Sequence, residues 1–69
     1  MNIHPDDLAT LEALIDRAGL SRVIEAMARI CSDKGEHLRS NWQDEHGGKL
    51  WDKKMMFLDN LARKLELLS

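Results

Sequence analysis

The chain has one cysteine, one proline, no tyrosine and only three aromatic residues, two tryptophans and one phenylalanine, among 69 positions. A single cysteine, Cys31, excludes an intrachain disulfide. A chain of this length forms one domain, whose core only marginally offsets the conformational entropy lost on folding. Without a disulfide, oligomerisation is the support we expect for a single helical domain over residues 1–69.

The sequence also lacks long apolar runs and blocks of like charge. No stretch approaches the roughly 18 consecutive apolar residues of a membrane helix, and the first residues lack the positive and apolar regions of a signal peptide. The net charge of −2 argues against a sequence-independent grip on nucleic acid. We therefore expect a cytoplasmic protein without membrane contact.

The whole sequence is 43% hydrophobic and 32% charged, the composition of a folded globular chain. Pro5 suits the first turn of a helix, and Asp6 and Asp7 put negative charge at the positive end of its dipole. Gly19 is the residue type that commonly ends a helix. The pattern predicts a helix over residues 5–18.

Two longer helices are predicted to follow. Ser21 is a good N-cap for a helix over 21–44, whose apolar stripe is Ile24, Met27, Ala28, Cys31, Gly35, Leu38 and Trp42. The pair Gly47-Gly48 costs about 2 kcal/mol of helix propensity relative to alanine, which predicts a turn there. A helix over 49–67 then carries the stripe Trp51, Met55, Leu58, Leu61, Ala62, Leu65 and Leu68.

The predicted fold is all-α, a short first helix followed by a hairpin of two longer ones. Because the short helix cannot cover both long apolar stripes, the sequence predicts a two-fold helical-bundle homodimer. Its core or dimer seam is predicted to contain Gly35, Cys31, Leu38, Trp42, Trp51, Leu58, Leu61 and Leu65. The two tryptophans are expected to pack against each other; a pocket on another protein is the alternative for them.

Residues 30–44, ICSDKGEHLRSNWQD, followed by Trp51, resemble a group of short helical proteins of bacteria and their phages that has no known activity. The resemblance extends over residues 11–62. Gly35 and Gly47-Gly48 stand where that group has residues better suited to helices. What the resemblance implies is origin rather than mechanism.

The sequence gives little support for a metal site or a catalytic site. Cys31, His37 and His46 do not have the spacing of paired metal ligands, and Cys31 is better explained as a small apolar residue of the stripe. Asp33 could orient His37 one turn away, but short helices offer little concavity for a substrate. We expect no enzyme activity, metal or cofactor.

Residues 14–25 have the helix, glycine turn and helix of a helix-turn-helix, which makes a DNA-binding regulator the main alternative. A recognition helix needs outward basic or amide side chains near its start. Here Arg22, Arg29 and Arg39 are spread along a face that also carries Glu25, Asp33 and Glu36. An ordinary corner between two helices is the preferred interpretation.

The function predicted is a protein-interaction module that occupies a surface on another protein, as a phage or mobile-element regulator or inhibitor would. On the outer face of the 49–67 helix, Met56 and Leu67 are apolar where water is expected. Lys53 and Arg63 would form a basic rim, so the predicted partner offers an apolar groove with an acidic rim. Arg39 and Gln43 are predicted secondary contacts.

Overall fold

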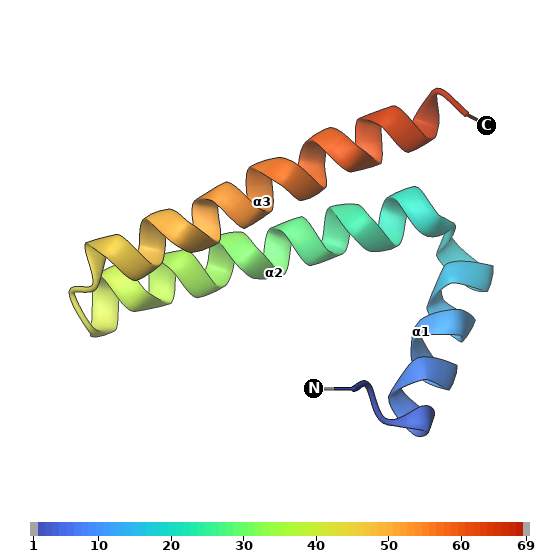
Figure 1. The fold of residues 1–69 in the computed structure, drawn as a ribbon, viewed down its shortest axis with the longest axis horizontal. Coiled ribbons are helices and arrows are strands. Elements are labelled where there is room, and N and C mark those ends of the chain that lie inside the picture. The colour runs from blue at the N-terminus through green and yellow to red at the C-terminus, as the bar shows by residue number, and fades with distance from the viewer. Residues whose placement is uncertain (1, 69) are drawn as a thin grey trace.

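The computed structural model describes residues 2–68, and over that range it contains three helices and no strand. They are α1 (Pro5–Ala18), α2 (Leu20–Asn41) and α3 (Glu45–Glu66). Helices α2 and α3 lie antiparallel along their whole length, while α1 projects from the start of α2 on the side away from α3 (Figure 1). The predicted all-α class and the hairpin of two long helices are confirmed.

The bounds predicted for α1 are also confirmed. Pro5 occupies the start of the helix, and the Nδ1 atom of His4 accepts a hydrogen bond from the Asp6 amide at 3.1 Å. Gly19 ends the helix with φ 93°, a backbone conformation that glycine adopts without a steric cost. The same Gly19 is the N-cap of α2, so α2 begins at Leu20 and Ser21 is not its cap.

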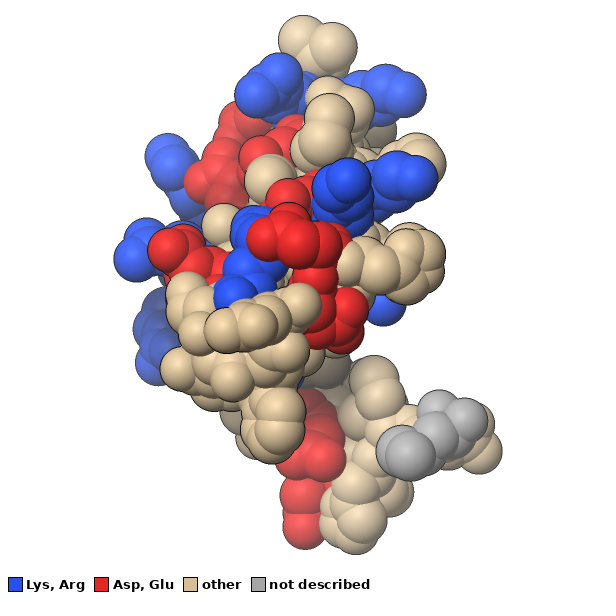
Figure 2. All heavy atoms as spheres, turned by 90° about the vertical axis from the view of Figure 1, so that its left-hand side faces the viewer, with Lys and Arg blue, Asp and Glu red and all other residues tan. Residues whose placement is uncertain are grey.

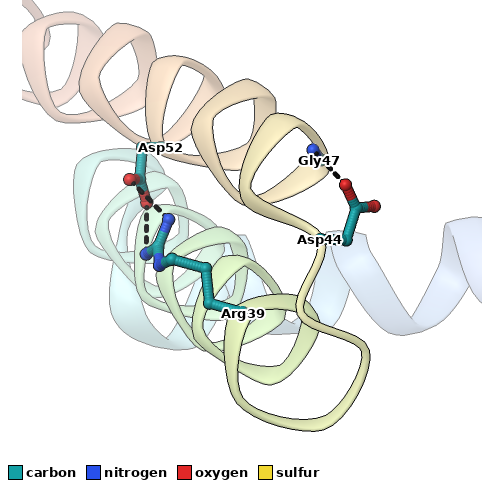
Figure 3. A network of polar contacts seen from close by, with 4 residues as sticks. All are labelled: Arg39, Asp44, Gly47 and Asp52. Atoms are coloured by element: carbon teal, nitrogen blue, oxygen red, sulfur yellow. Dashed lines mark hydrogen bonds and ion pairs between the residues drawn. The ribbon is translucent and has the colours of Figure 1, made fainter.

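The turn of the hairpin lies earlier than predicted, over residues 42–44, and Gly47-Gly48 does not break the helix. Asp44 is the N-cap of α3, and its carboxylate accepts a hydrogen bond from the Gly47 amide at 2.9 Å (Figure 3). The cap offsets the poor helix propensity of the glycines, because it satisfies an amide that the first turn leaves unpaired. Helix α2 therefore ends at Asn41, and α3 begins at Glu45.

Gly35 of α2 and Gly48, in the first turn of α3, lie where the two helices are in close contact. A Cβ atom on Gly35 would stand 3.1 Å from the carbonyl oxygen of Gly48, and one on Gly48 would stand 3.2 Å from the carbonyl oxygen of Gly35. Small side chains continue this close packing toward the other end of the hairpin, where Ala28 and Ala62 are each 2% exposed. The helices approach closely because the residues between them are small.

Helix α1 adds little to the core. It contacts α2 alone, and none of its residues is buried. The radius of gyration of 13.9 Å exceeds the about 11 Å expected for a compact domain of this length. The molecule is therefore an open, L-shaped arrangement rather than a closed three-helix bundle (Figure 1).

Candidate functional site

The hairpin has two different flanks, which diverge from the contact between Gly35 and Gly48. Successive residues of a helix point about 100° apart, so Leu38 and Arg39 turn to opposite sides of this contact. Trp51 and Asp52 do the same on α3. Leu38 and Trp51 share one flank, where they line a common hollow, and Arg39 and Asp52 meet on the other.

The flank that contains Arg39, Asp52, Glu25, Ser32 and Asp59 is the polar flank. Arg39 donates two hydrogen bonds to the Asp52 carboxylate, at 3.0 and 3.2 Å, which join α2 to α3 (Figure 3). The hydrogen bonds to Asp52 raise the pKa of Arg39 above its ordinary value. All the acidic residues of α3 recur every seventh position, and so lie toward this side of the helix: Glu45, Asp52, Asp59 and Glu66.

Gly48 is needed for that ion pair as well as for the helix contact. A Cβ atom on Gly48 would stand 2.9 Å from Cγ of Arg39 and 2.6 Å from its Nη1 atom. The arginine side chain thus crosses the glycine on its way to Asp52. The glycine that looked like a helix breaker makes room for a contact between helices.

The opposite side is the apolar flank, made up of Met27, Ile30 and Leu38 of α2 and Trp51, Leu58, Leu61 and Leu65 of α3. Leu38, Trp51, Leu58 and Leu65 are half-buried, and the other three are exposed. Leu50 and Phe57 extend it outward along α3, and Phe57 is 77% exposed. No described segment of the chain covers this flank.

Lysines border the apolar flank. The Nζ atoms of Lys34 and Lys54 lie 5.6 and 4.1 Å from the centre of the Trp51 ring, one from each helix. Lys64 lines a further hollow with Leu58 and Leu61. The one acidic residue at this edge, Asp33, forms an ion pair with Arg29 at 3.7 Å. The border of the flank is therefore basic.

The predicted partner-binding face on α3 is exposed. Met56 and Leu67 are 58% and 84% exposed, and Lys53 and Arg63 are exposed beside them. Gln43 is also exposed, in the hairpin turn with φ 50°. Arg39 differs from expectation, because its guanidinium turns toward Asp52 rather than outward. Whether these residues bind a partner stays a prediction.

The residues predicted for the core or dimer seam divide into three groups, of which the half-buried one is Leu38, Trp51, Leu58 and Leu65. Cys31 and Gly35 are buried. Leu61 is exposed and Trp42 is 70% exposed, so neither belongs to the core of the single chain. Trp42 is the C-cap of α2, beside the hairpin turn, where its amide donates to the Leu38 carbonyl oxygen while its side chain lies outside the core of the single chain. A role at a dimer seam stays a prediction for both.

Sequence reasoning missed the exposure of Ile30 and Phe57. Ile30 lies about 200° around the helix from the buried Ala28, so its rotation alone could have placed it outside the helix contact. Phe57 precedes Leu58 of the predicted stripe, and it lies beyond the edge of the helix contact. Both side chains are exposed because only a narrow strip of each helix faces the other helix, and neither residue lies on that strip.

The arginines of the possible recognition helix are engaged within the chain. Arg22 pairs with Glu25 at 3.5 Å, Arg29 with Asp33 at 3.7 Å and Arg39 with Asp52 at 3.0 Å. The pairs of Arg22 and Arg29 are exposed and cost little to open, so they do not prevent these arginines from contacting DNA, and DNA binding stays an untested alternative. His37 contacts Asn41 at 2.7 Å rather than Asp33, and no metal-binding cluster occurs within residues 2–68.

These features define a class, a small all-α protein in which a two-helix hairpin with one polar and one apolar flank carries a projecting N-terminal helix. No protein-family model, curated protein or solved structure matches the chain. Among the described residues, no helix combines the length and the hydropathy needed to cross a membrane.

Proposed function

We propose that the protein is a small helical interaction module that works as a homodimer and presents the outer face of α3 to another protein. The observation that carries this proposal is the apolar flank, which lies uncovered on the single chain. Large apolar side chains outside the core outnumber those within it: among residues 2–68, the buried hydrophobic residues are Ile24, Ala28, Cys31 and Ala62. Such a surface is typical of a protein that is completed by association.

The accessible area supports association. The chain exposes 5818 Å², whereas a compact monomer of 7.9 kDa exposes about 4,400 Å². The excess is about 1,400 Å², more than the roughly 800 Å² that each partner of a standard interface buries. A second copy is the partner that is always present at the required concentration, and two-fold pairing is the commonest arrangement.

The homodimer is tested by the double change Ile30→Ser with Leu61→Ser, which makes the apolar flank polar without touching a buried residue. We expect light scattering to give twice the chain mass for the parent and the single-chain mass for the variant. A parent that stays monomeric at tens of micromolar would remove the dimer from the proposal.

The second surface is the outer face of α3, where Met56 and Leu67 lie about 16 Å apart along the helix axis. Phe57 lies between this face and the apolar flank, since it shares one hollow with Lys53, Met56 and Asn60 and another with Leu58 and Leu61. An exposed methionine and aromatic side chain beside lysines suit an apolar groove with an acidic rim. By occupying such a groove, the module would act as a regulator or inhibitor of its partner.

This surface is tested by Met56→Ser with Leu67→Ser, which is also the matched control for the change on the apolar flank. We expect the melting temperature and the dimer mass to be unchanged, while the partner recovered from the native host with the parent protein is lost. If the partner is still recovered, the binding site lies elsewhere on the molecule. If folding is lost, these side chains belong to a core that the single chain does not show.

A further inference from the structure

We propose that α1 binds in trans, with its apolar stripe on the apolar flank of a second copy and its acidic residues beside that flank's lysines. The inference rests on the proposed homodimer and deepens it. It says which elements meet. It also assigns a function to α1, whose projecting position the single chain leaves without an explanation.

Helix α1 is poorly supported within its own chain. It has 14 residues, none of them buried, and it contacts only α2. A lone helix of about 12–15 residues is marginal in water, because the cost of nucleation is recovered only through packing of an amphipathic face. That face exists, since Leu11, Leu14 and Ile15 are half-buried and Leu8 is exposed in line with them. Something further must cover it.

The chain's own apolar flank cannot be the cover. A single residue, Gly19, joins α1 to α2, and one residue spans at most about 3.6 Å. Helix α1 is therefore fixed at the end of the hairpin that contains the start of α2, from which it points away from α3 (Figure 1). The apolar flank runs from that corner along the hairpin, across the direction of α1, over helices of 22 residues or about 33 Å (Figure 1).

Charge selects a second copy as the occupant. Helix α1 carries Asp6, Asp7, Glu12 and Asp16 against the single cation Arg17. In Figure 2 the lower part of the molecule, where α1 lies, shows acidic side chains and no basic ones on the visible face. The apolar flank is bordered by Lys34, Lys54 and Lys64, and the acidic row of α3 lies toward the polar flank. An acidic amphipathic helix is the complement of a lysine-bordered apolar surface.

Two-fold symmetry makes the exchange reciprocal. In an isologous dimer, if α1 of one copy lies on the flank of the other, the second α1 lies on the first flank. Two apolar helix faces and two apolar flanks are then covered at once. This accounts for an excess area that is larger than a standard interface requires on each side.

The test is a photocrosslink between copies. Cys31, the only cysteine, is replaced by Ser, and Leu8→Cys in that background is labelled with a benzophenone maleimide. The labelled protein is mixed with unlabelled, ¹⁵N-enriched Cys31→Ser protein, left to exchange subunits and irradiated. Peptide mass spectrometry identifies the chain and the segment that received the probe. The matched control carries the probe at Glu36→Cys, an exposed position toward the polar flank.

We expect the Leu8 probe to insert into ¹⁵N peptides that contain residues 27–38 or 50–65, and the Glu36 probe to give several-fold fewer such products. Insertion only within the labelled chain, in a sample whose mass is that of a dimer, would overturn the exchange of α1 and leave the homodimer standing. A sample that is monomeric by light scattering, while far-ultraviolet circular dichroism shows it folded, would overturn both. The proposal that the outer face of α3 binds another protein does not depend on either result.

Discussion

Gly35 is the residue whose replacement tests the hairpin most directly. It is buried in the middle of α2, and a Cβ atom there would lie 3.1 Å from the Gly48 carbonyl oxygen and 3.4 Å from Cβ of Trp51. The backbone on the facing helix cannot give way without separating the helices. The poor helix propensity of glycine is therefore offset by the close approach that it permits.

We predict that Gly35→Leu destabilises the protein by about 1–3 kcal/mol, because overpacking a close helix crossing forces the backbones apart. Urea denaturation followed by circular dichroism measures the change. Ser40→Leu is the control, since it adds the same side chain to an exposed position of α2. Equal stability of the two variants would show that the contact at Gly35 is not close in solution.

Arg39 shows how a residue's surroundings can reverse its interpretation. In sequence it belongs to a face of charged residues that suggests contact with water or a partner. In the structure its guanidinium is held by both oxygens of Asp52 across the helix pair (Figure 3). A bidentate pair of this kind favours one register of α2 against α3, because two parallel hydrogen bonds between planar groups restrict how the side chains can meet.

At the scale of elements, the start of α3 depends on one carboxylate. The first turn of α3 contains Gly47 and Gly48. Glycine lowers the stability of a helix because it loses more conformational entropy on folding than other residues. The hydrogen bond from the Gly47 amide to Asp44 fixes the turn at the point where the helix is intrinsically weakest.

We predict that Asp44→Ala lowers the free energy of unfolding by about 0.5–2 kcal/mol, the usual range for the loss of an N-cap. Urea denaturation measures it, and Lys49→Ala, an exposed change in the next turn, should leave stability almost unaltered. The amides of the first turn should also exchange faster with solvent in the Asp44 variant. No effect in either measurement would mean that the helix begins at another residue.

Helix α1 should depend on association in a way that the hairpin does not. Its contacts with its own chain are few, so local opening should be easy in a single chain. We predict that the amides of residues 9–18 lose protection from hydrogen exchange on dilution or in the Ile30→Ser, Leu61→Ser variant. Amides in the middle of α2 should keep theirs. Protection of α1 that is independent of concentration in a monomeric sample would contradict a docked position on a second copy.

At the scale of the whole molecule, stability should depend on protein concentration. A species that buries apolar surface only as a dimer is favoured by mass action, and a tenfold rise in concentration shifts the association equilibrium by about 1.4 kcal/mol. We predict a melting temperature that rises across a hundredfold range of concentration for the parent protein. A melting temperature that stays constant over this range would indicate a chain that folds alone.

The variant Met56→Ser with Leu67→Ser should follow the same concentration dependence as the parent, because its changes lie on the outer face of α3. The Ile30→Ser, Leu61→Ser variant should lose the dependence together with the dimer mass. The pair of variants separates association with a second copy from the binding of another protein.

The sequence alone determined the helical class, the two ends of α1 and the apolar stripes of the hairpin. These follow from local chemistry: Pro5 and Gly19 act on their own backbone, and the spacing of apolar side chains repeats with the helix itself. The exposure of Met56 and Leu67 was predictable for the same reason, since position around one helix needs no knowledge of a second.

Only the tertiary structure decided what the central glycines do, which way Arg39 points and how much of each apolar stripe stays open. Gly48 is read as a helix breaker from propensity, and only the approach of Gly35 and Arg39 shows that its missing side chain is used. The strip of α2 that faces α3 is narrow, because small residues bring the backbones close and leave Ile30 and Leu61 outside. Burial depends on residues far apart in the chain, and such contacts are not encoded in the periodicity of either helix.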